Sequence, residues 1–225
     1  MKAALFDFGG TIDTDGVHWS ERFWEYYLRY KIDVPKADFE KAFVQADTEI
    51  LKNDLSKATF KRILELQVAK QFELLGLLKD GNGQDEFVRA CYADTVKVIG
   101  EAKRLLEEIK KRYLLALVSN FYGNLNVVCR EFGLDEVFKV RIDSEIVGVH
   151  KPDPRIFGIA LERLSVRPEE AYVVGDSYDR DIAPGKQLGC RTIWIKGKSW
   201  KEESRTIAAD HIIGKFEELR SILLS

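Results

Sequence analysis

Short apolar runs alternate with helical stretches through residues 98–225, and this alternation is the strongest constraint on the fold. Segments such as 124–134 and 153–166, which lie between the runs, carry apolar residues at helical spacing. Near-continuous apolar strands separated by helices are typical of a parallel sheet that is covered on both faces. We therefore predict an α/β fold with a doubly wound, mostly parallel sheet and right-handed crossovers. The strands are expected within 3–6, 114–119, 137–142, 171–176 and 191–196, with a weaker strand and a last helix over 210–224.

Residues 17–97 interrupt this alternation with helical periodicity. Ser20 is expected to cap the first helix, and aromatic residues then recur at the spacing typical of a packed helical core. A turn-rich stretch at 79–84 precedes a helix predicted over 85–96. A separate amphipathic helix is predicted over 101–113, with basic residues in its last turn. We therefore predict two units, an α/β core of residues 1–16 plus 98–225 and an all-helical insertion of residues 17–97.

Charge and cysteine usage exclude several classes of function. The formal net charge is -2, with acids and bases interspersed, which is not the pattern of a nucleic-acid binder. The three cysteines are scattered and form no Cys-x-x-Cys pair, so a zinc site is not expected. The first apolar run is broken at Asp7, too early for a signal peptide or a membrane span. We expect a cytoplasmic monomer or homodimer that binds neither nucleic acid nor a membrane.

Polar side chains follow the predicted strands at the edge where ligands bind in such sheets. The carboxyl ends of parallel strands share one edge, so side chains from separate strands should converge there. Their types suit phosphoryl transfer: an aspartate can attack phosphorus, a lysine can balance the charge, and further carboxylates can hold Mg²⁺. The residues in question are Asp7 and Thr11 after the first strand, Ser119 and Asn120 after the second, Lys151 in "HKPDP", and Asp176 and Asp181 after "AYVV".

Four of these segments, "DFGGT", "LVSN", "KPDP" and "GDSYDRDI", resemble in order and spacing the motifs of the haloacid dehalogenase superfamily. The resemblance implies a Rossmann-like core, with the helical insertion as a cap. It also implies Mg²⁺ as cofactor and a small phosphorylated substrate. Asp7 is then the nucleophile and Lys151 the charge-balancing lysine. We expect Thr11, Ser119 and Asn120 to bind substrate. The implied metal ligands are Asp7, the backbone carbonyl of Gly9, Asp176 and Asp181, the last as a direct ligand or beside one.

Gly9 departs from this family pattern. Phosphatases of the superfamily carry an aspartate there, which protonates the leaving group and then activates the attacking water. General acid–base help of this kind contributes about 10²–10⁴-fold to a rate. Because every other element of the metal and phosphate site is present, we expect a metal-dependent hydrolase. The absent carboxylate predicts that its aspartyl phosphate breaks down slowly. Its acid or base would come from the substrate, from the cap or from Asp13, and restoring the carboxylate with Gly9→Asp should raise turnover.

Two other functions stay open on the sequence alone. Phosphonate hydrolysis in this superfamily needs a cap lysine, for which Lys52 and Lys57 are candidates by position. Haloacid dehalogenation is less favoured, because its enzymes lack the acidic loop seen here. The other alternative is a protein that binds a phosphorylated ligand or a partner with little turnover. His18 and His150 are assigned no catalytic role, since a lone histidine is more often structural or exposed.

Overall fold

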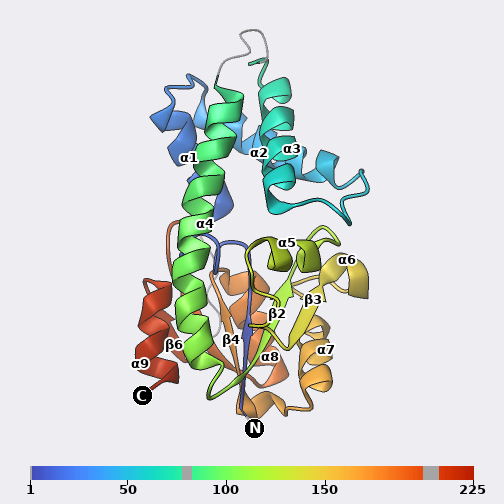
Figure 1. Ribbon diagram of the computed structural model, residues 1–225, viewed down its shortest axis with the longest axis vertical. Helices are drawn as coiled ribbons and strands as arrows, with labels where there is room; N and C mark the ends of the chain where they lie inside the picture. Colours follow the sequence, from blue (N-terminus) through green and yellow to red (C-terminus); the bar gives the residue numbers. More distant parts are fainter. Residues whose placement is uncertain (1, 78–82, 200–207) are drawn as a thin grey trace.

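The structure, a computed structural model, describes residues 2–77, 83–199 and 208–225. Within these residues, six parallel strands form one sheet in the order β3-β2-β1-β4-β5-β6 (Figure 1). The predicted doubly wound, Rossmann-like α/β sheet is therefore confirmed, with β1 near its centre. The strands are β1 (Ala3–Phe6), β2 (Leu114–Ser119), β3 (Val140–Asp143), β4 (Ala171–Gly175), β5 (Arg191–Ile195) and β6 (His211–Ile213).

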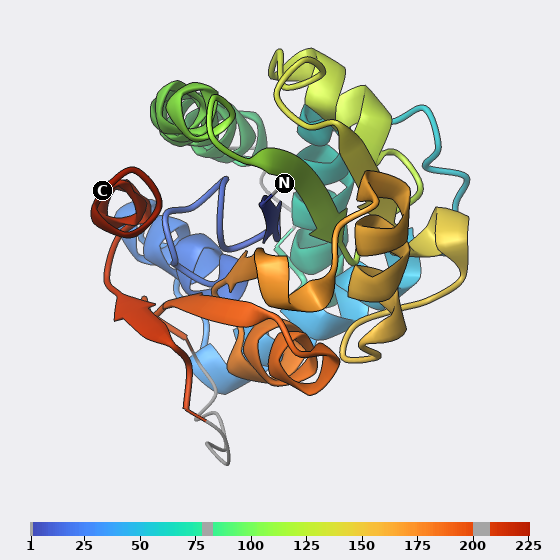
Figure 2. The same ribbon diagram turned by 90° about the horizontal axis from the view of Figure 1, so that it is seen from below.

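Helices cover both faces of the sheet. Because successive side chains of a strand point to opposite faces, neighbouring residues pack into different clusters. Phe6 of β1 packs into the cluster that also holds side chains of α4, α5 and α9. Its neighbour Leu5 packs into the cluster formed with α7. Seen from below, the sheet lies between α4 and α9 on one side and α7 and α8 on the other (Figure 2). These helices are α4 (Gln84–Ile109), α5 (Leu125–Glu131), α7 (Arg155–Leu164), α8 (Ala183–Leu188) and α9 (Leu219–Leu223).

The inserted helices lie beyond the carboxyl ends of the central strands (Figure 1). Their interior is an aromatic cluster in which Phe23, Tyr27, Phe39 and Phe87 are almost fully buried. Tyr27 is in ring contact with both Phe39 and Phe87, at centroid distances of 4.8 and 5.6 Å. The predicted aromatic packing core of the helical segment is therefore confirmed. The inserted helices are α1 (Trp19–Arg29), α2 (Lys36–Ile50) and α3 (Phe60–Leu74).

The prediction of two helices at 85–96 and 101–113 was wrong. Helix α4 runs unbroken for 26 residues, from the helical part down the side of the sheet, and crosses the predicted boundary at residues 97 and 98 (Figure 1). Apolar side chains continue at helical spacing through the junction, and Gly100 alone is too weak a signal to end a helix. The basic residues 110–112 follow the helix end, so they are not in its last turn.

The prediction that Ser20 caps the first helix was also wrong. His18 is the N-cap of α1, and its ring Nδ1 accepts a hydrogen bond from the backbone N–H of Ser20. Ser20 lies inside the first turn, where its hydroxyl pairs with the same ring nitrogen at 2.7 Å. The remaining short helices are α6 (Ser144–Val147), η2 (Pro168–Glu170), η3 (Tyr178–Ile182) and η4 (Phe216–Glu218). Residues 79–82 of the predicted turn lie outside the described residues.

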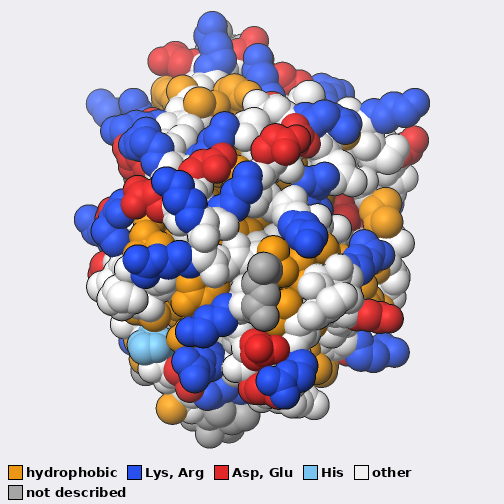
Figure 3. All heavy atoms as spheres, turned by 60° about the horizontal axis from the view of Figure 1, so that its bottom comes forward, with side chains coloured by type: hydrophobic (Ala, Val, Ile, Leu, Met, Phe, Trp, Pro, Cys, Tyr) orange, Lys and Arg blue, Asp and Glu red, His pale blue; other side chains and the backbone are white. Residues whose placement is uncertain are grey.

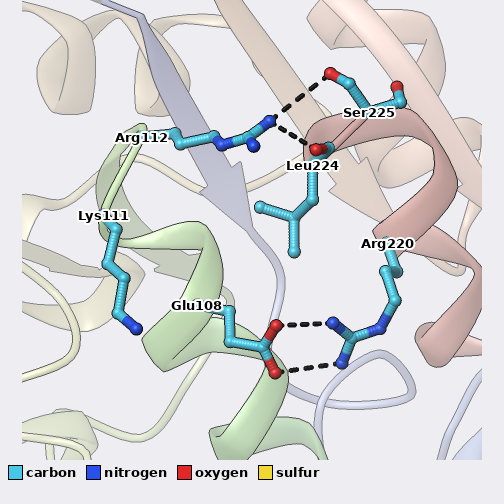
Figure 4. Close-up of a pocket in the computed structure, with 6 residues that line it drawn as sticks. All are labelled: Glu108, Lys111, Arg112, Arg220, Leu224 and Ser225. Atoms are coloured by element: carbon cyan, nitrogen blue, oxygen red, sulfur yellow. Dashed lines mark hydrogen bonds and ion pairs between the residues drawn. The ribbon is translucent and has the colours of Figure 1, made fainter.

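A pocket of about 500 Å³ lies between the end of α4 and α9 (Figure 4). These elements lie on the side of the molecule away from the carboxyl ends of the strands (Figure 1). The two arginines of the pocket are already engaged. Arg220 forms a two-pronged ion pair with Glu108, at 2.5 and 3.0 Å. Arg112 donates to the backbone carbonyls of Leu224 and Ser225. The pocket is therefore held by internal pairs and is separate from the predicted site.

Two surface observations bear on partners. On the face shown in Figure 3, basic and acidic side chains are interspersed. In the part of the chain that the structure describes, no helix has both the length and the apolar character needed to cross a membrane.

Candidate active site

The predicted site residues meet at the carboxyl ends of β1, β2 and β4. Asp7 directly follows β1, and its backbone N–H donates to the carbonyl of Val174 in β4 at 2.9 Å. This bond continues the sheet ladder past the end of the strand, so the backbone that carries Asp7 is fixed. Ser119 is the last residue of β2, and its hydroxyl donates to Asp7 Oδ1 at 3.1 Å. The convergence expected from strand order is therefore observed.

Lys151 is the centre of a buried ion-pair network. Its Nζ lies 2.6 Å from Asp7 Oδ1 and 2.6 Å from Asp181 Oδ1, and its side chain is 2% exposed. Burial by itself lowers the pKa of this amine, but the charges of Asp181 and Asp7 outweigh burial and raise its pKa above the usual value. Lys151 is thus held as a cation against two carboxylates.

The carboxylates outnumber this cation. Ligand atoms of Asp7, Asp176 and Asp181 all lie within 4.8 Å of one another. Burial raises the pKa of Asp176 well above its usual range, and repulsion by Asp7 and Asp181 adds to the rise. Burial also raises the pKa of Asp181 to about 6, although Lys151 opposes this. The negative charge of these three carboxylates exceeds the positive charge of Lys151. Hard oxygen donors of this type suit Mg²⁺.

Thr11 and Asn120 orient other members of the site. The Thr11 hydroxyl donates to Asp176 Oδ1 at 3.1 Å and is fully buried. Asn120 makes a reciprocal pair with Lys151: Nδ2 donates to its carbonyl at 3.0 Å, and Oδ1 accepts from its N–H at 2.8 Å. The oxygen and the nitrogen of the Asn120 side-chain amide therefore both fix the backbone of Lys151. Direct contact of Thr11 and Asn120 with substrate stays a prediction.

Two glycines allow the carboxylates to approach the loops. Gly10 has a φ of +91°, and a Cβ built there would overlap the carboxylate of Asp176. A Cβ on Gly175 would overlap Asp181 in the same way. These glycines belong to the quoted motifs "DFGGT" and "GDSYDRDI", but sequence reasoning gave neither of them this steric role.

Asp143 is a site-supporting residue that the sequence analysis missed. It ends β3 beside Ser119, and its carboxylate accepts backbone N–H groups of Gly123, Leu125 and Glu145 at 3.0–3.1 Å. Burial raises its pKa, although these three bonds oppose the rise. The side chain thereby fixes the start of α5 and the loop after Ser119. The available signal was an aspartate before a short helix, which is a common N-cap.

We predict that Asp143→Ala lowers the free energy of unfolding by about 2–4 kcal/mol, because it leaves buried N–H groups without an acceptor. Chemical denaturation monitored by tryptophan fluorescence measures this. Asp153→Ala is the matched control, since Asp153 also accepts a local N–H, from Arg155, but the contact is exposed. Equal losses in the two variants would contradict the role given to Asp143.

The inserted helices dock directly onto the site loops. Tyr122, three residues after Ser119, donates its hydroxyl to Asp47 Oδ1 of α2 at 2.5 Å. Glu131 of α5 accepts the N–H of Phe60 at the start of α3 at 2.5 Å and the hydroxyl of Tyr92 at 2.9 Å. These bonds join the helical part to the loops around Asp7. The inserted helices therefore lie over the carboxyl ends of the strands, where Asp7 and Ser119 are placed (Figure 1).

Other candidates lie outside this cluster. Lys52 and Lys57 are both exposed, and Lys52 pairs with Glu49 at 2.7 Å. His150 is half exposed and 3.7 Å from Glu145. The three cysteines are buried and unpaired.

Known proteins share this fold and its sequence features. The model of the haloacid dehalogenase-like hydrolase family matches residues 1–189. A glyceraldehyde 3-phosphate phosphatase of Pyrococcus furiosus is 30% identical over 166 residues, which are 72% of this chain and 66% of that protein. The chain spans about half to two thirds of the length of the first curated relatives it matches, 51% and 66% in two cases.

Two solved structures extend the likeness to the whole chain. A haloacid dehalogenase-type phosphatase from Thermococcus onnurineus is 25% identical with a TM-score of 0.55, covering 99% of this chain and 98% of that one. A dehalogenase solved with an intermediate complex is 20% identical with a TM-score of 0.65, covering 100% of this chain and 98% of that one. At that identity the second likeness concerns the fold alone.

Proposed function

This chain belongs to the haloacid dehalogenase-like hydrolase family, and we propose that it is a Mg²⁺-dependent phosphatase for a small phosphorylated metabolite. The single observation that carries this proposal is the buried network in which Lys151 joins Asp7 to Asp181 at 2.6 Å, beside Asp176. The phosphatases among the similar proteins support the same reaction class. By the family resemblance, the acidic loop at 176–181 also favours a phosphatase over a dehalogenase.

The residues divide the reaction between them. Asp7 attacks phosphorus, the bond to the leaving oxygen breaks, and an aspartyl phosphate forms. Its second oxygen is the attacking atom, because Oδ1 already accepts from Lys151 and Ser119. Lys151 and Ser119 then hold the phosphoryl oxygens as negative charge develops. Water attacks the aspartyl phosphate in the second step, which releases phosphate and restores Asp7.

Asp7, Asp176, Asp181 and the carbonyl of Gly9 would hold the metal. When bound, Mg²⁺ supplies positive charge against the phosphoryl oxygens and the three carboxylates. We place the boundary of the helical cap at 17–97 and the core at 1–16 plus 98–225. We also place the protein in the cytoplasm, since its buried, unpaired cysteines suit a reducing compartment. Monomer and homodimer both stay predictions.

The proposal predicts release of phenol from an aryl phosphate only when Mg²⁺ is present. Good leaving groups should react best, because they need little acid assistance at Gly9. The measurement is phenol release at high enzyme concentration, with and without Mg²⁺ and with EDTA. A stoichiometric burst followed by a slow phase is the expected shape, because the missing carboxylate slows the second step.

The control is Asp7→Asn under the same conditions. Release that continues unchanged in EDTA would contradict the metal role. No release above the Asp7→Asn background with aryl or acyl phosphates would contradict phosphatase chemistry and direct attention to phosphonates, haloacids or a partner protein.

A further inference from the structure

The place that a side chain at residue 9 would occupy is covered by an indole ring. A Cβ built on Gly9 would lie 3.8 Å from Cδ1 and 3.9 Å from Nε1 of Trp19, the first residue of α1. The ring is held there by contacts with Phe23 and Phe60, at centroid distances of 5.5 and 5.7 Å. The N–H edge of the indole therefore borders the space in which the missing carboxylate would lie.

The indole N–H of Trp19 donates to the carboxylate of Asp13. Asp13 Oδ2 accepts from Trp19 Nε1 at 2.8 Å, and Asp13 Oδ1 accepts from the backbone N–H of Gly10 at 2.8 Å. The residue is only 1% exposed. Its carboxylate is thus folded back onto the glycine pair that follows the nucleophile, at the same edge of the sheet.

We propose that Asp13 carries the proton that the carboxylate absent at Gly9 would otherwise carry. This inference rests on the proposed phosphatase function and names the residue that completes it. In the first step, a proton on Asp13 passes to the leaving oxygen as its bond to phosphorus breaks. In the second step, Asp13 takes a proton from the attacking water as the water oxygen bonds to phosphorus and the bond to Asp7 breaks.

The surroundings of Asp13 suit both steps. Burial raises the pKa of Asp13 to about 7, opposed by the hydrogen bonds from Trp19 and Gly10 and assisted by the charge of Asp7. A group with this pKa is present in both protonation states near neutral pH, which is the condition for general acid–base catalysis. The titratable groups whose charges interact with it are Asp7 on its own loop, Cys91 on α4, Tyr122 after β2 and Asp176 after β4.

Trp19 is a positioning residue in this scheme. Its N–H occupies one oxygen of Asp13 and fixes the direction of the carboxylate. Because Trp19 begins α1, this contact also ties the start of the inserted helices to the nucleophile loop.

The test is a double-mutant cycle on residues 9 and 13 that follows aryl phosphate turnover in Mg²⁺. Asp13→Asn alone should lower turnover by about 10²–10⁴-fold. It should leave the initial burst of phenol almost unchanged, since a good leaving group needs little acid. In the Gly9→Asp background the same Asp13→Asn change should cost less than about tenfold, because the new carboxylate does the proton work. Asp15→Asn is the matched control, since Asp15 lies on the same loop and accepts a backbone N–H from Phe216.

The alternatives are separable. If Asp13 is only structural, Asp13→Asn will reduce burst and turnover together, by the same factor in both backgrounds, and the proposal is overturned. Unchanged turnover in Asp13→Asn overturns it as well. Should the Gly9→Asp protein not fold, the burst and the slow phase of Asp13→Asn decide by themselves. Failure of the phosphatase function itself would appear earlier, as wild-type protein with no release above Asp7→Asn.

Discussion

Asp7→Asn should lower phosphatase turnover by about 10⁴-fold or more, because it removes the group that attacks phosphorus. The initial burst should disappear with the steady-state rate, since no aspartyl phosphate can form. The fold should be retained, because the amide oxygen of Asn can still accept from Lys151 and Ser119. Rapid-quench measurement of phenol release checks both phases. The enzyme concentration must be high enough for the burst to exceed the uncatalysed release of phenol.

The same variant has an expected effect on stability. Loss of the Asp7 charge weakens its pair with Lys151 but relieves its repulsion of Asp176, and Lys151 keeps its pair with Asp181. Unfolding in the absence of metal should therefore need about as much denaturant as in the wild type. Such a denaturation result would exclude misfolding as the cause of lost activity. A variant that folds normally and keeps its burst would show that Asp7 is not the nucleophile.

Lys151→Met should abolish activity and lower the free energy of unfolding by about 3–5 kcal/mol, because it leaves two buried carboxylates without their cation. Met has similar length and no charge, so the loss is mainly electrostatic. Equilibrium denaturation in metal-free buffer measures the stability, and aryl phosphate turnover measures the activity.

Lys52→Met is the matched control for this substitution. Lys52 is 2.7 Å from Glu49, close to the 2.6 Å of the buried pair, but its side chain is 65% exposed, against 2% for Lys151. An exposed pair contributes about 0–1 kcal/mol, so this variant should stay near wild type. Lost activity in Lys52→Met would instead favour the phosphonate alternative. Similar stability losses in the two variants would contradict the importance of burial.

The sheet could be predicted because its strands leave few alternatives. "LLALV" and "AYVVG" contain no charged residue, and the residues that follow them, Ser119 and Asp176, lie in the site. The position of Asp7, Ser119 and Asp176 then follows from the shared edge of parallel strands. Lys151 comes from a loop rather than a strand end. Residue types predicted that its charge balances Asp7, but not its second contact of 2.6 Å, with Asp181.

The connections between elements could not be predicted in this way. The unbroken course of α4 is an intermediate case: the apolar spacing continues through Gly100, but a charged junction that contains glycine also suits a loop. Sequence periodicity does not show that His18 rather than Ser20 caps α1, since both are polar residues at the start of the helix, two positions apart. Asp143 and the Asp13–Trp19 contact depend on residues that are close in space, and local sequence carries little information about such pairs.

Helix α4 has a mechanical consequence for any movement of the inserted helices. A 26-residue helix is about 39 Å long, and α4 contains no proline or π-bulge at which it would kink. As a stiff rod it would convert a rotation of about 10° at its sheet end into a displacement of about 7 Å at the far end. The rod leads directly into β2, the strand that ends at Ser119. A tilt of α4 would therefore be transmitted to β2 and so to Ser119, whose hydroxyl donates to Asp7 at 3.1 Å.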